Sequence, residues 1–360
     1  MSRKKILFLS PYPLNTAPSQ RLKYEQYYPY FEEAGYELTT SSFVTKEFWR
    51  VIYQPGHYPI KVFFTFLGYG RRILDLFRLR RFDIVYVHLW VTPIGPPIME
   101  WLVRRFSKKL IYDIDDLVYL NDKREKNRIM LLIRGRQKAM KLMKVANHVI
   151  CCTPMLESFV RKFNDKVTDI SSTIDTSLYE ARTDYVLHSP PVLGWSGSHS
   201  TSRYLHLLAE PLRKLRASYP FILKVIGAPS FEMEGVEVKA VEWNSESEVE
   251  ELQEFDIGLY PLPLDEEWVN GKSGLKALQY MALGIPTIAT AVGANFRIIE
   301  NGKNGILIKD GDWEEQIKRL LQMHDFRKSL GQAAMITVKK QYSLESSYEY
   351  YLSVLREVIK

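Results

Sequence analysis

The sequence has few of the features that mark secreted or membrane-spanning chains. Two cysteines occur among 360 residues. They are the neighbours Cys151 and Cys152, between which a bridge would be strained. This excludes a disulfide framework, and a reducing cytosol is the simplest expectation. The first apolar run covers only Ile6 to Leu9, whereas a signal peptide needs roughly 7–15 apolar residues. No segment approaches the roughly 18 uninterrupted apolar residues of a membrane span.

Negative charge is scarce in the first half of the chain. The whole chain carries 49 Lys and Arg against 42 Asp and Glu, a net charge of +7. Residues 1–180 carry 29 basic and 18 acidic residues, a balance of +11, which leaves −4 for residues 181–360. This asymmetry calls for an anionic partner of the N-terminal half. No nucleic-acid-binding motif is present, so we expect no nucleic acid.

Basic and apolar residues interleave in this half. One stretch combines arginines with Ile, Leu and Phe, and a second follows Trp101: Arg71, Arg72, Arg78, Arg80 and Arg81, then Arg104, Arg105, Lys108 and Lys109. Such helices suit adsorption to an anionic membrane surface. The alternative is that their apolar faces pack on a sheet while the arginines are solvated. We favour the membrane surface.

Strand-like apolar runs alternate with helix-like segments along the whole chain, which predicts parallel, doubly wound α/β sheets. Residues 19–34 are expected to be helical, although Pro29 interrupts them. Ser and Pro residues break the pattern between about residues 172 and 191. The sequence therefore predicts two Rossmann-like domains that face one another across a cleft. The first domain covers residues 1–175, and a C-terminal helix at about 343–360 is expected to pack back on it. The second domain covers residues 176–342.

The segment 270–290 carries the most specific chemistry. Gly271, Lys272, Ser273 and Gly274 precede a predicted helix, whose N-terminus offers unpaired N–H groups to a phosphate. Lys276 lies four residues after Lys272, on the same helix face. The glycine spacing of a P-loop is absent, so that motif is excluded. An exposed helix with no ligand is the alternative.

This segment resembles the nucleotide-sugar signature of the retaining glycosyltransferases of family 4, also called group 1, which have the GT-B fold. Residues 279–286 read QYMALGIP, where the family has a pattern like Glu-Tyr-Met-Ala-x-Gly-x-Pro. Residues 256–262 and 194–198 are similar to two strands of the family's C-terminal domain. The resemblance covers most of residues 145–342.

The resemblance implies an enzyme that moves a sugar from a nucleoside diphosphate to an acceptor with retention of configuration. The acceptor is expected to be a lipid-linked or polysaccharide-precursor glycan. No cofactor or metal is expected to be required. The protein is expected in the cytoplasm, peripheral on the inner face of the cell membrane. Two other classes stay open: a GT-B-like sugar-nucleotide epimerase, and a catalytically silent sugar-nucleotide-binding protein.

Some family residues are replaced in this sequence. The two glutamates that the family commonly carries, seven residues apart, fall on Gly271 and Gln279. Gln279 keeps an amide oxygen that accepts a hydrogen bond without charge. Lys272 and Lys276 are interpreted as compensating diphosphate contacts, and Lys276 is assigned a catalytic role. The loop Ser10 to Ser19 also lacks the glycines that the family usually has there.

The remaining candidates follow predicted strands. Ser198, His199 and Arg203 are expected to bind the donor diphosphate. Three carboxylates in four residues, Asp113, Asp115 and Asp116, repel one another and require a partner or a function. A metal-binding Asp-x-Asp and a polar cluster that faces the substrate are the two interpretations, and the second fits GT-B. Asp115 and Asp116 are therefore predicted as catalytic, and Asp113, His88 and Arg21 as acceptor contacts.

Overall fold

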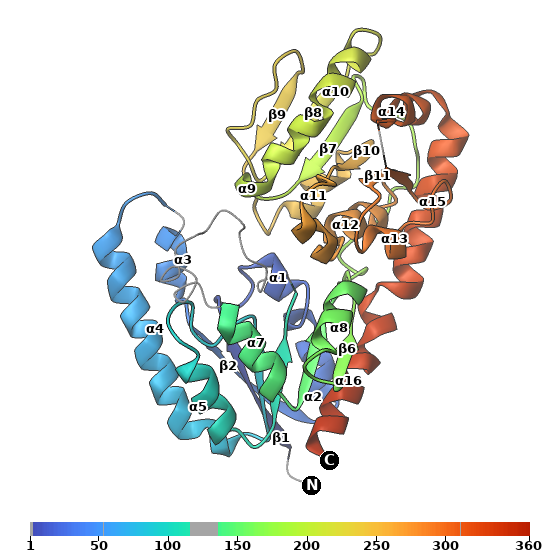
Figure 1. Cartoon of the computed structure of the whole chain (residues 1–360). Helices are drawn as coiled ribbons and strands as arrows, with labels where there is room; N and C mark the ends of the chain where they lie inside the picture. Colours follow the sequence, from blue (N-terminus) through green and yellow to red (C-terminus); the bar gives the residue numbers. More distant parts are fainter. Residues whose placement is uncertain (1–2, 53, 116–135, 310) are drawn as a thin grey trace. The chain divides into compact units, whose positions relative to one another are not determined.

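The computed structural model describes residues 3–52, 54–115, 136–309 and 311–360. The chain divides into two compact units (Figure 1). Unit 1 contains residues 1–171 and 347–360, and unit 2 contains residues 172–346. Each is described by itself. No helix among the described residues is long and apolar enough to cross a membrane.

Unit 1 is built on a parallel sheet of six strands in the order β2-β1-β3-β4-β5-β6. The strands are β1 Lys4–Ser10, β2 Tyr36–Ser42, β3 Ile84–His88, β4 Leu110–Asp113, β5 His148–Cys151 and β6 Val167–Asp169. The last five residues of β1 are buried, and so are all the residues of β3, β4 and β5. Strands buried on both faces read as continuous apolar runs, which is why the sequence predicted them.

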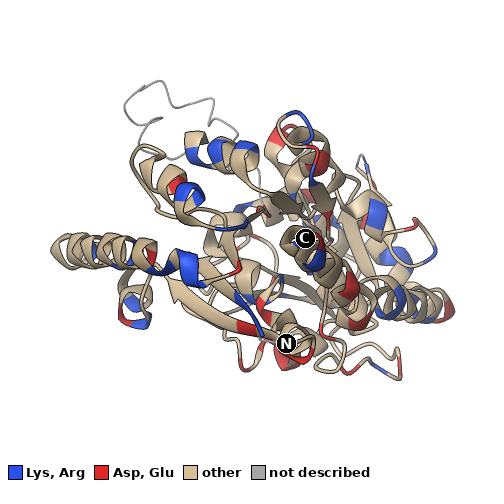
Figure 2. Cartoon of the chain, turned by 90° about the horizontal axis from the view of Figure 1, so that it is seen from below, with Lys and Arg blue, Asp and Glu red and all other residues tan. Residues whose placement is uncertain are grey.

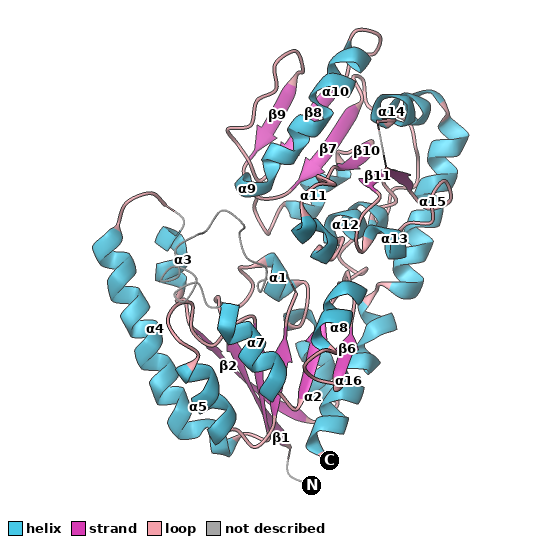
Figure 3. Cartoon of the chain, in the orientation of Figure 1, coloured by secondary structure: helices cyan, strands magenta, loops and turns pink. Residues whose placement is uncertain are grey.

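Helices join these strands (Figure 3). They are α1 Pro18–Arg21, α2 Tyr28–Glu33, α3 Lys46–Ile52, α4 Tyr58–Arg78, α5 Ile98–Phe106, α7 Arg136–Val145, α8 Pro154–Val160 and α16 Leu344–Ile359, with 3₁₀ turns at Glu25–Tyr27 and Leu79–Arg81. The single helix predicted over residues 19–34 was wrong in detail. It is divided into α1, a 3₁₀ turn and α2, and Pro29 lies in the first turn of α2, where its missing N–H costs nothing.

The C-terminal helix α16 belongs mostly to unit 1. The ring of Tyr351 lies 4.6 Å from that of Tyr27 and 6.0 Å from that of Phe31. All three side chains are buried. The end of the chain therefore supplies part of the core of the N-terminal unit.

Unit 2 has a second parallel sheet of six strands, in the order β12-β11-β10-β7-β8-β9. The strands are β7 Val192–Ser196, β8 Ile222–Ile226, β9 Val238–Val241, β10 Ile257–Tyr260, β11 Thr287–Thr290 and β12 Ile306–Ile308. Numbered from β7, this is the 3-2-1-4-5-6 order of dinucleotide-binding folds. The predicted α/β class with two doubly wound sheets is confirmed.

Helices cover both faces of the second sheet (Figure 3). They are α9 His199–Ser202, α10 Ala209–Arg216, α11 Glu248–Gln253, α12 Leu275–Ala282, α13 Asn295–Ile298, α14 Trp313–Gln322 and α15 His324–Gln341, with 3₁₀ turns at Arg203–Leu208 and Glu267–Gly271. Leu193 and Trp195 of β7 enter one core cluster and Val192 enters the other. This alternation follows from the two-residue period of a strand.

Two glycines let aromatic rings lie directly on this sheet. A Cβ on Gly194 would lie 1.9 Å from Cγ of Phe255, and one on Gly258 would lie 2.5 Å from Cδ2 of Tyr280. The Tyr280 hydroxyl then accepts a hydrogen bond of 2.8 Å from the backbone N–H of Ser196. Helix α12 is thereby held against the carboxyl end of β7, where the candidate site lies.

Candidate nucleotide-sugar site

The candidate site lies where the strand order of the second sheet reverses. β7 and β10 are neighbours in the sheet, and their crossover connections leave in opposite directions. In open parallel sheets, ligands bind beyond the carboxyl ends of the strands at such a point. Ser196 ends β7 and Gly197 follows it, and Tyr260 ends β10.

A glycine turn directs α12 to this point. Gly274 precedes the helix with φ +73°, a left-handed conformation that glycine adopts without steric cost. A Cβ there would lie 2.4 Å from Cδ1 of Ile298. Any other residue at position 274 would be strained, so the chain enters α12 in a conformation that depends on this glycine. The half-buried Ser273 directly precedes it.

The two predicted lysines lie beside aromatic rings. Lys276 Nζ lies 5.4 Å from the ring centre of Trp195 and 5.5 Å from that of Tyr260. Lys272 Nζ lies 4.4 Å from the ring centre of Trp268. A ring face attracts a cation, so these contacts help to fix both side chains.

Lys276 also lies against the loop after β7. A Cβ on Gly197 would lie 2.8 Å from Cε of Lys276 and 2.4 Å from the Trp195 ring. Burial and the neighbouring charge of Lys272 lower the pKa of Lys276 to about 7. A cation that is costly to keep at neutral pH gains from an anion, and this favours phosphate at the site.

The Gly/Ser loop places the next two candidates on the surface. Ser198 and His199 are both exposed. The Ser198 hydroxyl lies 2.9 Å from that of Ser200 and 3.2 Å from that of Thr201. The loop packs closely on β8, because a Cβ on Gly227 would lie 1.9 Å from the carbonyl oxygen of Gly197. The structure therefore brings residues 197–199 to the strand ends near Lys276.

Arg203 is engaged by a carboxylate. Its Nη2 lies 3.6 Å from Glu266 Oε1 and donates a 3.1 Å hydrogen bond to the Tyr204 hydroxyl. Glu266 also accepts hydrogen bonds from Tyr204 and from the indole N–H of Trp268. This network joins the two 3₁₀ turns of unit 2. It also fixes the indole ring of Trp268, against which Lys272 lies. The sequence did not single out Glu266, and no local signal marks it.

Gln279 lies inside α12. The side chain is buried, and its amide N–H donates a 2.9 Å hydrogen bond to the hydroxyl of Tyr179. Tyr179 belongs to the segment before β7, so a residue outside α12 fixes the orientation of the Gln279 amide. Gly271, which stands at the other glutamate position, is buried at the end of a 3₁₀ turn. The donor contacts predicted for both residues stay predictions.

Two candidates of unit 1, Asp113 and His88, lie in a buried cluster at the end of β4. Lys23 and Tyr86 both donate hydrogen bonds to the Asp113 carboxylate. Nδ1 of the fully buried His88 lies 3.7 Å from the same carboxylate. Burial raises the pKa of Asp113, but Lys23 and His88 outweigh it and the net pKa is lowered.

Lys23 is the cationic partner of Asp113 and lies close enough to Asp115 to interact with its charge. Burial lowers its pKa, but Asp113 and, to a lesser extent, Cys152 and Asp115 raise it, so that the net pKa is raised. Sequence reasoning missed this lysine because 90 residues separate it from Asp113. The acceptor roles of Asp113 and His88 stay predictions.

Two further described candidates of unit 1, Asp115 and Arg21, are less buried than this pair. Asp115 is half-buried, and its backbone carbonyl accepts a 3.3 Å hydrogen bond from the Cys152 thiol. Arg21 ends α1 and is half-buried. Asp116 lies outside the described residues. The catalytic and acceptor roles of these residues stay predictions.

One expectation about the basic helix was wrong. Arg72 is fully buried, so it is neither solvated nor available to a membrane. It donates hydrogen bonds to the carbonyl oxygens of Ser10, Ser41 and Val91 and pairs with Asp75 at 3.1 Å. Arg71, the preceding residue, is only half-buried, so two neighbouring arginines of the sequence differ in their burial.

The family model described as Glycosyl transferases group 1 matches residues 190–325. These residues include the strand-order reversal, both lysines and Arg203. The match lies within unit 2. A curated relative, N-acetyl-alpha-D-glucosaminyl L-malate synthase of Bacillus anthracis, is 30% identical over 90 residues. That match spans 24% of this chain and 24% of the relative's length.

Solved structures resemble the whole chain. Sucrose-phosphate synthase of Thermosynechococcus elongatus superposes with a TM-score of 0.72 at 15% identity and covers 99% of both chains. HepE of Anabaena in complex with UDP-glucose has a TM-score of 0.68 at 14% identity and covers 98% of this chain and 99% of its own. A glycosyltransferase of Rickettsia africae has a TM-score of 0.68 at 16% identity and covers 100% of both. At these identities the likeness shows the fold, which is GT-B.

Proposed function

We propose that the chain is a retaining glycosyltransferase of family 4 that moves a sugar from a nucleoside diphosphate to an acceptor. One observation carries the proposal. Within the matched domain, Lys276 lies beside Gly197 and Tyr260 at the strand ends where this type of sheet binds ligands. HepE binds UDP-glucose on the same fold, which makes a uridine diphosphate sugar the first donor to test.

The chemistry follows from charge. As the sugar leaves, negative charge grows on the nucleoside diphosphate. Lys272 and Lys276, with the backbone N–H groups of residues 271–274, would stabilise that charge where it develops, which is commonly the largest catalytic contribution. With two cations for the diphosphate, the proposed reaction requires no metal. The proposed acceptor is a lipid-linked or polysaccharide-precursor glycan.

Calorimetry with UDP and UDP-glucose tests the donor site. Lys272→Ala should weaken binding by about tenfold or more, because a charge-assisted contact contributes roughly 1.5–3 kcal/mol. The matched control is Lys303→Ala. Lys303 is an exposed lysine of unit 2 that pairs with Glu300 at 2.9 Å. Equal affinity in both variants, or no turnover of any nucleotide sugar with lipid extract, would refute the proposal.

We also propose that unit 1 lies on the anionic inner face of the cell membrane, which places the protein in the cytoplasm. Large apolar side chains of α4 are exposed, among them Phe63, Phe66, Leu67, Leu74 and Phe77, the last with 81% of its surface accessible. Ile98 and Trp101 are exposed on α5, which packs against α4. Exposed arginines accompany them at positions 80, 81 and 105. Apolar and basic groups together favour an anionic bilayer.

Vesicle flotation tests this surface. The parent should float with phosphatidylglycerol-containing vesicles and much less with pure phosphatidylcholine. Phe66→Glu with Phe77→Glu should abolish flotation. The control is Phe296→Glu with Tyr350→Glu, since these side chains are exposed to 63% and 59% elsewhere in the chain. Equal flotation of the two double variants would contradict the assignment.

A further inference from the structure

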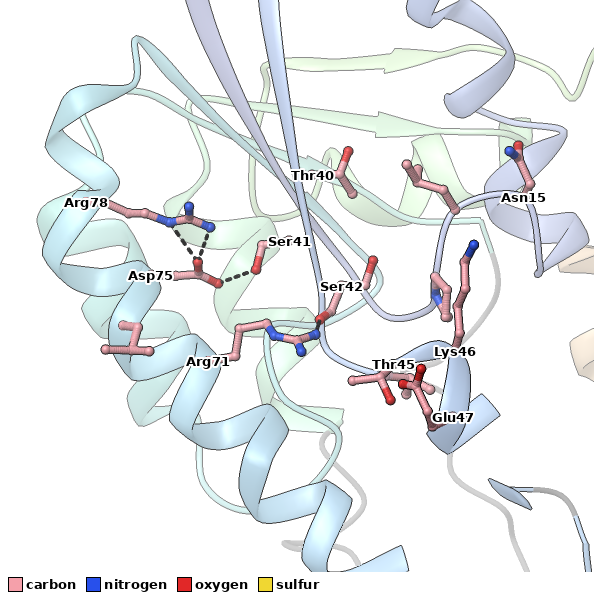
Figure 4. Close-up of a pocket in the computed structure, with 14 residues that line it drawn as sticks. Asn15, Thr40, Ser41, Ser42, Thr45, Lys46, Glu47, Arg71, Asp75 and Arg78 are labelled. Carbon is pink, nitrogen blue, oxygen red and sulfur yellow. Dashed lines mark hydrogen bonds and ion pairs between the residues drawn. The ribbon is translucent and has the colours of Figure 1, made fainter. Parts of the chain in front are cut away.

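Unit 1 contains a cavity of about 890 Å³ at the carboxyl end of β2. Its walls come from the end of β2, the loop around Asn15, the start of α3 and one side of α4 (Figure 4). None of the residues predicted as site residues from the sequence lines it. The cavity therefore shares no lining residue with the candidate site of unit 2 or with the buried Asp113 cluster.

The one carboxylate deep in the cavity wall is already neutralised. Asp75 is almost fully buried. Arg72, which is also buried, pairs with it at 3.1 Å, and the hydroxyl of Ser41 donates a 2.7 Å hydrogen bond to it. Because Arg72 balances Asp75 from inside the unit, the negative charge of Asp75 does not repel an anion in the cavity.

Two further arginines of α4 line the cavity, and both are held in place. Arg78 donates to Asp75 Oδ1 through Nε and Nη2 at 3.0 and 2.7 Å. Arg71 donates from Nη1 to the carbonyl oxygen of Ser42 at 2.5 Å. A guanidinium has five N–H donors, and these bonds use two in Arg78 and one in Arg71. Each arginine is fixed by part of its donor set, which lowers the entropy cost of binding an anion.

The charge around the cavity is positive. Lys46, Arg71 and Arg78 line it together with Glu47 and Asp75. With Asp75 balanced by Arg72, three cations face one carboxylate, that of the exposed Glu47. The arginines lie seven residues apart, two turns along one side of α4 (Figure 4). Planar guanidinium donors match the oxygens of a phosphate.

We propose that this cavity binds the phosphate group of a second ligand, distinct from the nucleotide of the donor. Hydroxyls of Thr40, Ser42 and Thr45 also line it, and neutral donors of this kind complete the coordination of a phosphate beside arginine. The binding itself does not rest on the proposed transferase activity. If that activity holds, the phosphate belongs to the acceptor.

The rim of the cavity indicates where such a phosphate comes from. Leu14 and Leu74 line the cavity and are 39% and 69% exposed. Leu74 is part of the exposed apolar face of α4. A phosphate on an apolar carrier would place its head group against the arginines and its chain along that face. A soluble phosphomonoester offers the same head-group chemistry without the chain.

The test compares two double variants of the full-length protein. Arg71→Gln with Arg78→Gln removes two charges from the cavity. Arg161→Gln with Arg356→Gln removes two charges from exposed arginines of unit 1 that belong neither to the cavity nor to the proposed membrane surface. Both are made with Lys272→Ala and Lys276→Ala, so that phosphate binding at the donor site does not contribute. The probes are glycerol 3-phosphate, followed by calorimetry, and vesicles with or without phosphatidylglycerol, followed by flotation.

The cavity variant should bind the probe at least tenfold more weakly than the control variant. Binding of glycerol 3-phosphate identifies a soluble ligand, and binding of phosphatidylglycerol vesicles alone identifies a lipid head group. Both results support the cavity. Bound probe should also protect Arg71 and Arg78 from modification by phenylglyoxal. Equal binding by the two variants, or binding to neither probe, overturns the proposal. The proposed donor site is tested separately, by nucleotide binding to the parent, so the two proposals can fail independently.

Discussion

Among the residues of the candidate site, Lys276 has a strongly lowered pKa. A lysine in water keeps its proton to about pH 10, but burial and Lys272 lower the pKa of Lys276 to about 7. Much of this lysine is therefore neutral at physiological pH when the site is empty. A diphosphate would raise the pKa again, so donor binding should be coupled to proton uptake.

This coupling predicts a pH dependence of donor affinity. A nucleoside diphosphate is fully ionised above about pH 7, since its last phosphate pKa is near 6. Between pH 7.5 and 9 the parent should lose up to about tenfold in affinity per pH unit, because binding must first protonate Lys276. Calorimetry of UDP in two buffers measures both affinity and proton uptake. Lys276→Arg, which stays charged, should bind with little pH dependence, and a flat profile for the parent would contradict the assignment.

At the scale of one element, α4 combines a packed side and an exposed side. Gly68 and Gly70 lie two residues apart in it. A Cβ on Gly68 would lie 2.6 Å from Cζ of the buried Phe43, whereas among the described residues nothing lies within 4 Å of a Cβ on Gly70. The same substitution should therefore have opposite effects at the two positions.

Alanine at these two glycines tests that arrangement. Gly70→Ala should raise the free energy of unfolding by roughly 0.5–1 kcal/mol, because alanine is the better helix former. Gly68→Ala should lower it by about 1–3 kcal/mol, because the Phe43 ring must move in a packed core. Urea unfolding followed by circular dichroism measures both changes. If both variants shift in the same direction, Phe43 does not pack on α4 as described.

The elements differ in how far the sequence could predict them. The strands were predictable because both faces of each sheet are buried, which produces continuous apolar runs. For α4 the sequence favoured an exposed apolar and basic surface, but it could not tell which apolar side chains are exposed, since Phe64 and Phe66 look alike in sequence and differ in burial. Arg71 and Arg72 were not distinguishable, because their different burial depends on carbonyl oxygens at the ends of β1 and β2, which lie far away in the sequence. The lysines of α12 were predictable because their chemistry lies within one short segment.

At the scale of the whole molecule, unit 1 depends on the end of the chain. Five apolar side chains of residues 347–360 are buried: Tyr351, Leu352, Val354, Leu355 and Val358. At roughly 1.5–3 kcal/mol each, their burial is comparable to the whole stability of a typical domain, about 5–15 kcal/mol. Unit 2 is complete without residues 347–360.

A chain that ends at residue 346 tests this dependence. We expect unit 1 to lose its cooperative unfolding transition while unit 2 keeps its own, as followed by calorimetry and by limited proteolysis with mass spectrometry. The matched control ends at residue 358, so that the five buried side chains are kept. The expectation fails if the chain of residues 1–346 retains both transitions of the parent.

Most of α16 belongs to unit 1 but follows unit 2 in the sequence, which sets an order of folding during synthesis. Domains generally fold as they leave the ribosome, the N-terminal one first, at about 5–20 residues per second. Here residues 1–171 wait for their last helix while residues 172–346 are made, a delay of roughly ten to thirty seconds at that rate. Unit 2 is complete first, although its sequence comes second. The nascent N-terminal half spends that interval with an open core, so a chaperone that shields apolar surface would act on this half rather than on unit 2.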